Sequence, residues 1–370
     1  MYYIPLVLMI PFCIAEMVRR DKKNILFNLV FCVLLIMLCF RYGQGTDYFG
    51  YMYNYYMGDE HSEIGYRALG ELFKFVGVKF EGFVFVVSLF QMGCIYRAIM
   101  LYSPYKVMSL LILYPTIYLT YLCSALRQGI VVGFFLGFMV KWLLEDSKKK
   151  YIVGCIVLST IHSASLILLV LIFIKKYSQR FLYLCLIGAA TVGCLVYVMP
   201  KSILAHINIG SFQYYIQETS VSFLGLLERI VLFIIITWVF KAVSKTSEKY
   251  EGISILYKVY FVGFIVSIAT SPWGIVSSRL AMMMKAVEVL LIPMMIKENR
   301  KYRQLLLVFL IGYSLLMTTK NVSDYIDQGG YNGYNVINYP YLNVWDRDEA
   351  HRIRKQDDHL KSMLKKRVIN

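Results

Sequence analysis

The chain alternates between long uncharged apolar runs and short segments rich in charge. Runs that approach 20 residues match the hydrocarbon core of a bilayer, and in lipid only helices and closed barrels satisfy their own backbone hydrogen bonds. The pattern therefore predicts an all-α polytopic integral membrane protein with about 10–12 transmembrane helices. The clearest runs cover residues 25–40, 83–91, 107–123, 130–140, 181–199, 230–240 and 305–317.

The basic residues between these runs predict the orientation of the helices. Four Lys and Arg side chains within residues 19–23 follow the first apolar stretch. Because cytoplasmic loops carry an excess of basic residues, this loop is expected inside and the N-terminus outside. Residues 41–81 then form a long outer loop, residues 200–221 form a second one, and the tail after Lys320 is also expected outside.

Residues 151–174 are apolar but have basic clusters on both sides, at 148–150 and at 175–180. A single crossing would place one of the clusters outside, against the usual distribution of charge. We therefore expect a broken or re-entrant hairpin with its tip near His162. Non-helical backbone at membrane depth is tolerated where it is buried in protein or lines a wet cavity, so the hairpin also predicts a cavity at His162.

The rest of the chain shows no internal repeat that would indicate further domains. Later crossings are expected at residues 223–240, 255–270, 279–296 and 305–318. The simplest organisation is one membrane domain over residues 1–320, which includes the outer loop 41–81 and the hairpin 151–174. A polar C-terminal tail follows over residues 321–370.

Composition narrows the classes of partner. Hydrophobic residues make up 58% of the chain, and the formal net charge is +16. The Lys and Arg residues lie mostly in short loops, as expected beside an anionic leaflet, and this argues against a nucleic-acid partner. The eight cysteines include no CxxC pair and are expected to be packing residues. Since P-loop, HExxH and Cys/His metal spacings are absent from the sequence, no metal and no cofactor is expected.

The outer loop opens with candidate chemistry: Arg41, two nearby glycines, Asp47, and the tyrosines Tyr48 and Tyr51. Arginine can donate two parallel hydrogen bonds to a phosphate, and glycine lets the backbone approach a ligand closely. Asp47 is a candidate proton acceptor, and the tyrosines offer flat faces suited to sugar rings. The alternative is an interfacial aromatic belt with a snorkelling Arg, which does not explain the glycines and Asp47 together.

Two more motifs lie at expected outer positions. Glu63 precedes Tyr66, a further candidate sugar contact, and Glu63 is either a base or a helix-start residue. Arg127 and Gln128 lie at the turn between two spans. Arg127 has no carboxylate nearby in the sequence, so an anionic ligand is expected for it.

The last candidates lie further along the chain. His162 and Ser163 fall at the predicted hairpin tip, where His162 is either a phosphate contact, a proton carrier or an ordinary core residue. Arg279 is a third arginine at an outer end, unless it only snorkels to the interface. Glu228 and Arg229 are adjacent within a span and are expected to form an internal ion pair.

Taken in order, these motifs resemble the EpsG/Wzy family of bacterial polysaccharide polymerases, over about residues 25–345. The matching segments are Arg41-Tyr-Gly-x-Gly-Thr-Asp47-Tyr48-x-x-Tyr51, Glu63-x-Gly-Tyr66, Leu126-Arg127-Gln128, Ile161-His162-Ser163-Ala164-Ser165, Arg279 before an apolar span, and Tyr339-Pro340-Tyr341.

The resemblance implies a membrane glycosyltransferase of the C class, at the outer face of the bacterial cytoplasmic membrane. Such an enzyme joins oligosaccharide repeat units carried on undecaprenyl pyrophosphate, without a nucleotide or a metal ion. The growing chain leaves its lipid and is transferred to the non-reducing end of the next unit. A lipid-linked glycan and the bilayer are the implied partners, with a flippase and a chain-length regulator as further candidates.

A pyrophosphate carries more charge than one Arg neutralises, so several cationic groups are expected around it. The hypothesis is that four residues converge on it: Arg41, Arg127, His162 and Arg279. Asp47 or Glu63 would take the proton of the acceptor hydroxyl. The alternatives are an O-antigen ligase, a membrane acyltransferase, or a non-enzymatic transporter of lipid-linked glycan. A transporter predicts charges through the membrane depth and related halves, and such halves are not evident.

Overall fold

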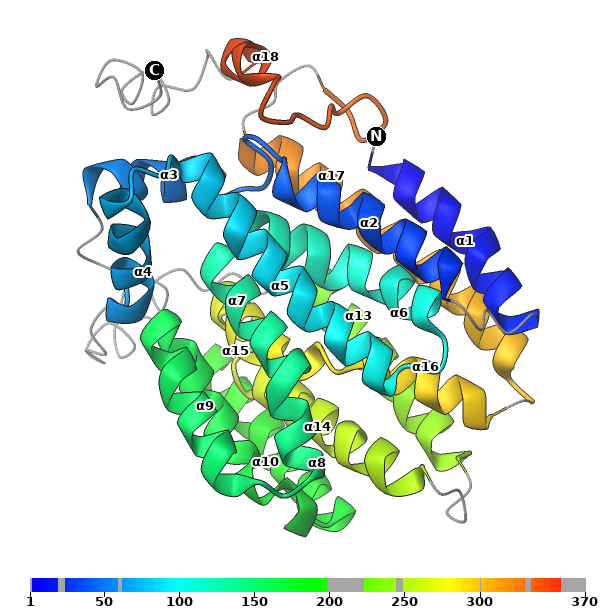
Figure 1. Ribbon diagram of the computed structural model, residues 1–370. Helices are drawn as coiled ribbons and strands as arrows, with labels where there is room; N and C mark the ends of the chain where they lie inside the picture. Colours follow the sequence, from blue (N-terminus) through cyan, green and yellow to red (C-terminus); the bar gives the residue numbers. More distant parts are fainter. Residues whose placement is uncertain are drawn as a thin grey trace. The chain divides into compact units, whose positions relative to one another are not determined.

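The computed structural model describes residues 2–18, 24–58, 62–198, 223–243, 249–299, 301–329 and 334–353. Across these ranges the chain is helical, and the extended backbone pairs only in an isolated bridge between Arg41 and Asn343. Figure 1 shows the resulting assembly of helices. The predicted all-α polytopic class is confirmed.

Within the described ranges, seven helical segments are long and apolar enough to cross a membrane. They are α5 (Phe80–Tyr102), α6 with η1 (Lys106–Ser124), α7 to α8 (Leu126–Leu144), α10 (Gln179–Val198), α13 (Phe223–Lys241), α14 (Tyr250–Ala269) and most of α17 (Arg303–Gly329). Two shorter apolar helices, α1 (Tyr3–Val18) and α2 (Ile25–Cys39), precede them. Burial differs strongly between segments: 83% of the most apolar window of α6 and η1 is buried, against 17% for α10, whose exposed apolar side chains suit lipid.

The described residues fall into two compact units, unit 1 within residues 1–138, 157–163 and 301–370 and unit 2 within residues 139–156 and 164–300. In unit 1, α7 (Leu126–Phe134) lies close against α5. A Cβ atom added at Gly129 would come within 2.5 Å of Gln91 Nε2, and one at Gly133 within 3.1 Å of the Gln91 carbonyl. Glycines four residues apart let two membrane helices approach closely.

In unit 2, α14 packs against α10, α13 and α15 (Gly274–Lys285), with Phe233 stacked on Phe264 at a centroid distance of 4.0 Å. The crossing expected at residues 279–296 is not continuous. It consists of the end of α15 and of α16 (Glu288–Glu298), interrupted at Ala286 and Val287. Hydropathy alone does not reveal such a break, because the residues on both sides of it are apolar.

The segment 151–174 forms two helices, α9 (Lys148–Ile161) and the 3₁₀ helix η3 (Ser163–Lys176), with His162 between them. The helices run antiparallel: Tyr151 donates to the Leu168 carbonyl at 2.9 Å. The ammonium groups of Lys148 and Lys176 each lie 5.8 Å from the Phe173 ring centroid. Both basic clusters are therefore at the same end of the helix pair.

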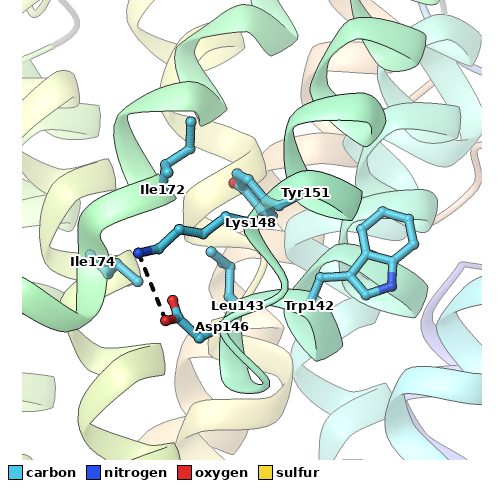
Figure 2. A pocket seen from close by; sticks show the side chains of 7 residues that line it. All are labelled: Trp142, Leu143, Asp146, Lys148, Tyr151, Ile172 and Ile174. Carbon is cyan, nitrogen blue, oxygen red and sulfur yellow. Dashed lines mark ion pairs between the residues drawn. The ribbon is translucent and has the colours of Figure 1, made fainter.

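Figure 2 shows a small pocket at this end, where Lys148 points toward Asp146 with the charged atoms 3.8 Å apart. Tyr151 and Ile172 line the same pocket from the two helices of the hairpin. The lining is mostly apolar, and we assign it to packing at the end of the hairpin.

The outer-loop sequence 41–81 contains α3 (Tyr48–Met57) and α4 (Ile64–Phe75), neither long enough to cross a bilayer. The expected domain boundary at residue 320 falls inside α17. Beyond that helix, residues 334–353 return to the loop, where the N–H of Tyr42 donates to the Leu342 carbonyl at 3.0 Å. The short helix α18 (Arg347–Ile353) follows. The predicted outer loop 200–221 and the basic residues 361–367 lie outside the described residues.

Candidate functional site

The carboxylate of Glu63 connects three segments of unit 1. Its Oε2 accepts a hydrogen bond from Nη1 of Arg127 at 2.6 Å. Its Oε1 accepts from the backbone N–H of Ser163 at 2.8 Å and from the Ser163 hydroxyl at 3.0 Å. The Nδ1 atom of His162 lies 3.4 Å from the same oxygen. Four residues named by the sequence motifs therefore meet at one carboxylate.

The environment keeps this carboxylate ionised. Burial raises the pKa of Glu63, but the neighbouring imidazole of His162, the N–H of Ser163 and the charge of Arg127 together lower it well below the ordinary value. The side chains of Arg127 and Glu63 are 26% and 18% exposed, so water screens their attraction only in part. Glu63 is thus a firm anchor for Arg127, and a weak proton acceptor.

Local sequence explains how Glu63 reaches the hairpin tip. Glu63 has extended backbone just before α4, as is usual for the residue that precedes a helix. A Cβ atom added at Gly65 would lie 2.8 Å from both the Cβ and the carbonyl oxygen of Thr160. Only glycine permits this approach of α4 to the end of α9. Gly65 therefore holds Glu63 beside His162 and Ser163.

Arg127 lies in the first turn of α7, which starts after a break at Ala125. Its guanidinium carbon is 5.9 Å from the ring centroid of Tyr51 and 5.8 Å from that of Tyr66. These two rings meet edge to face at 5.9 Å. Cation–π contact with two aromatic rings fixes the plane of the guanidinium.

Several nitrogen atoms at this site are buried without a protein partner. Among the described residues, Nε of Arg127 and both ring nitrogens of His162 have no hydrogen bond. The pairing of His162 with Glu63 at 3.4 Å is an electrostatic contact, longer than a normal N–H···O bond. Because buried polar atoms are nearly always satisfied by protein, water or a ligand, these atoms are free to bind a ligand at this site.

The guanidinium of Arg41, a predicted phosphate contact, is surrounded by protein acceptors. It is 1% exposed, and its guanidinium donates to the carbonyls of Leu38, Leu122 and Cys123 and to the Ser88 hydroxyl, at distances of 2.5 to 3.2 Å. All of these acceptors are neutral protein oxygens. Arg41 therefore ties the end of α2 to α5 and η1.

Gly45 packs against η1, one of the segments that Arg41 joins. Its backbone has φ of +91°, and a Cβ atom there would lie 2.7 Å from the Ser124 hydroxyl and 2.8 Å from the Cys123 carbonyl. The predicted close approach at this glycine is therefore made to protein backbone, in a conformation that other residues rarely adopt.

Asp47 lies at the start of α3, one helical turn before Tyr51. It is half-buried, accepts a hydrogen bond from the Thr46 hydroxyl at 2.9 Å, and precedes α3 by one residue. The N–H of Thr46 donates to the Ser124 hydroxyl at 3.3 Å, three residues before Arg127. Asp47 also precedes Tyr51 by one helical turn, with the Tyr51 N–H donating to its carbonyl at 3.0 Å.

Two predicted substrate contacts are buried. Tyr48 is 1% exposed and packs against Tyr42, Phe49 and Phe80, which places it in the core of unit 1. Gln128, 5% exposed, lies on α7 next to Arg127. In this arrangement Tyr48 supports α3, while Tyr51 and Tyr66 are the tyrosines that face Arg127.

Arg279 belongs to α15 in unit 2, where a second group of charges is buried. The expected ion pair between Glu228 and Arg229 is replaced by other partners: Glu228 pairs with Lys285 at 3.1 Å, and Arg229 donates to the hydroxyls of Ser267 and Ser277 at 2.6 Å each. Sequence reasoning missed Lys285. Its position inside an apolar run was the available signal, since charges within spans normally find partners.

Within the described ranges, no group of three or more His, Cys, Asp or Glu side chains lies close enough together to hold a metal ion. All cysteines of the chain are described and free.

Comparison with known protein families gives one clear result. A model of the EpsG family matches residues 2–341, nearly the whole chain. Comparisons with curated proteins and with solved structures gave no match.

Proposed function

The chain belongs to the EpsG family of membrane proteins of polysaccharide biosynthesis, and from this premise we propose that it polymerises lipid-linked oligosaccharide repeat units. The family implies a glycosyltransferase of the polysaccharide-polymerase type. The cluster of Glu63, Arg127 and His162 supports this proposal, because it contains nitrogen atoms that lack protein partners. The donor substrate we propose is a growing glycan on undecaprenyl pyrophosphate.

The reaction forms one bond and breaks one bond. The hydroxyl oxygen of the acceptor sugar bonds to the anomeric carbon of the donor, and the bond from that carbon to the pyrophosphate oxygen breaks. The hydroxyl proton passes to a base, and the lipid pyrophosphate leaves as an anion. Arg127 and His162 stabilise this anion, because donors aimed at developing negative charge lower the barrier most.

We assign the base to Asp47 and not to Glu63. The Glu63 oxygens already accept hydrogen bonds, and its pKa lies below the ordinary value, so it takes up a proton poorly. Asp47 lies one helical turn before Tyr51, which covers Arg127. Glu63 is a positioning residue that holds Arg127 and His162 for the pyrophosphate.

We place the protein in the bacterial cytoplasmic membrane as a multi-pass protein with this site at the outer face. The two basic clusters of the hairpin lie at one end of the helix pair, with Lys148 and Lys176 both over Phe173. That end is the cytoplasmic one under the distribution expected of basic residues, so the His162 tip points to the outer side. A flippase and a chain-length regulator are the partner proteins expected with such a substrate.

Polymerisation in vesicles that contain the purified protein and lipid-linked repeat units tests the proposal. Wild-type protein should produce a ladder of polymer, and should do so in the presence of EDTA. Arg127→Ala and His162→Ala should each slow ladder formation by about 30- to 1000-fold, the effect of about 2–4 kcal/mol of lost transition-state stabilisation.

Arg347→Ala is the matched control for Arg127→Ala. Arg347 also pairs with a glutamate, Glu81, at 2.8 Å in unit 1. This pair lies outside the proposed site, so its loss should leave ladder formation intact. Normal ladders from folded Arg127→Ala and His162→Ala proteins would show that the cluster has no part in the reaction.

A further inference from the structure

An open groove lies between α3 and α4, over the start of α5. Tyr51 and Tyr55 line it from α3, and Tyr66 from α4. Polar side chains from both helices also line it: Asn54 and Arg67, together with the ion-paired Glu71 and Lys74.

The lining combines flat aromatic faces with hydrogen-bonding groups at their edges. A sugar ring has the complementary chemistry, with an apolar face of C–H groups and a rim of hydroxyls. Arg67 is exposed and, among the described residues, its side chain makes no ion pair, so its donors are available to such hydroxyls.

The aromatic faces are held in place before any ligand arrives. The Tyr55 hydroxyl donates to the Val78 carbonyl at 2.7 Å, and its ring packs on Phe83 at a centroid distance of 5.4 Å. Tyr66 also packs on Phe83, at 6.0 Å. Rigid aromatic surfaces bind with little loss of side-chain entropy, which favours weak ligands such as sugars.

The groove and the Arg127 site share two tyrosines. Tyr51 and Tyr66 line the groove, and their rings also contact the Arg127 guanidinium at 5.9 and 5.8 Å. A glycan whose pyrophosphate lies at Arg127 has its next sugars within reach of these rings. The groove and the Arg127 guanidinium are therefore neighbours across these two rings.

We propose that this groove binds sugar residues of the growing lipid-linked glycan and holds the chain between successive additions. The assignment rests on the proposed polymerase function for the identity of the glycan. The groove contributes binding and leaves the chemical step to Arg127, His162 and Asp47. Its occupation should therefore control polymer length more than the rate of the first coupling.

Gly70 provides the test. It lines the groove on α4, and a Cβ atom there would meet only Tyr55 Cδ2, at 3.9 Å, an ordinary contact. Gly70→Gln fills the groove without forcing α4 to move, and Gly70→Ala adds a methyl group while favouring the helix. The matched control is Gly50→Gln on α3, an exposed helical glycine with nothing within 4 Å of the added Cβ.

Two measurements are needed on purified full-length protein. The first compares the rate of the first coupling with the final chain length in vesicles. The second measures binding of the oligosaccharide repeat unit after mild acid has released it from its lipid. We expect Gly70→Gln to weaken oligosaccharide binding about tenfold, or about 1.4 kcal/mol, and to shorten the polymer several-fold. The first coupling should stay within about twofold of wild type.

The outcomes separate the groove from the polymerase proposal. If Gly70→Gln and Gly50→Gln bind the oligosaccharide equally and make equal ladders, the groove proposal is wrong. The polymerase proposal still stands if wild-type protein makes polymer. If wild-type protein makes no polymer but binds the oligosaccharide, and Gly70→Gln weakens this binding, the groove proposal stands and the polymerase proposal is wrong. If Gly70→Gln does not fold, Gly70→Ala decides, with a smaller shift in binding supporting the groove and no shift refuting it.

Discussion

Glutamine in place of Glu63 keeps the size of the side chain and removes its charge. In the folded protein Oε2 accepts from Arg127, while Oε1 accepts from both the N–H and the hydroxyl of Ser163. The amide of Glu63→Gln presents an NH2 group where one of these oxygens stood. One donor then faces another donor, and the common partner of Arg127 and the hairpin tip is lost.

The size of the effect follows from the exposure of the pair. A hydrogen bond to a charged group contributes about 1.5–3 kcal/mol to stability, and more when the remaining partner stays buried. Arg127 and Glu63 are 26% and 18% exposed, so water replaces part of the loss and the lower half of that range applies. About 1.5–2 kcal/mol corresponds to roughly 10- to 30-fold in an equilibrium constant. We expect the rate of polymerisation to fall by a similar factor and the thermal midpoint to fall with it.

The control for this variant is Glu81→Gln. Glu81 is 15% exposed and pairs with Arg347 at 2.8 Å, so Glu81→Gln removes a comparable ion pair outside the site. Both variants should lower the midpoint of thermal unfolding. Only Glu63→Gln should lower the rate of polymerisation per folded molecule. Equal rates for the two variants would contradict the role given to Glu63.

A double-mutant cycle with Ser163→Ala tests the shared carboxylate directly. Because the Ser163 hydroxyl acts through Glu63, Ser163→Ala should add little once Glu63→Gln is present. Thermal midpoints and polymerisation rates of the wild type, both single variants and the double variant complete the cycle. Effects that add within about 0.3–0.5 kcal/mol would refute the connection, because additivity is the behaviour of independent sites.

Further predictions concern pH, topology and packing. Because the pKa of Glu63 is lowered on folding, its contribution to stability is present above the unfolded value of about 4.3 and is lost as the pH falls through the lower folded value. The difference in thermal midpoint between wild type and Glu63→Gln should therefore shrink as the pH falls below about 4. Cysteines placed at Lys148 and Lys176 should be labelled from the same side of the membrane, and labelling from opposite sides would exclude the hairpin. Gly65→Ala should separate α4 from Thr160 and reduce polymerisation about as much as Glu63→Gln, whereas full activity would show that the contact is dispensable.

The fold class could be predicted from sequence because hydrophobic length is a local property. The two basic clusters likewise indicated a break near His162, where α9 and η3 are separated by that residue. The interruption at Ala286 and Val287 was not predicted, since apolar residues lie on both sides of it. Local pattern therefore predicts where helices form, and it misses breaks that only packing against other helices explains.

Pairing within the site could not be read from the chain. Arg127 is 64 positions from Glu63, and Ser163 is 100 positions from it. Motif reasoning named these residues individually as phosphate or proton contacts. It could not show that a carboxylate already occupies one side of Arg127, because that depends on how α4, α7 and the hairpin tip pack together.

Arg41 and Arg127 show how the structure separates two arginines that the sequence treats alike. Leaving a charge without partners inside a membrane protein is expensive, so each arginine must find acceptors. Arg41 finds four neutral oxygens and is 1% exposed, a state in which a phosphate would have to displace protein hydrogen bonds. Arg127 has one carboxylate, two aromatic faces and a buried Nε without a partner, and it remains 26% exposed. An anion can therefore complete the hydrogen bonding of Arg127 without breaking the fold, and this difference in free energy is why we place the pyrophosphate there.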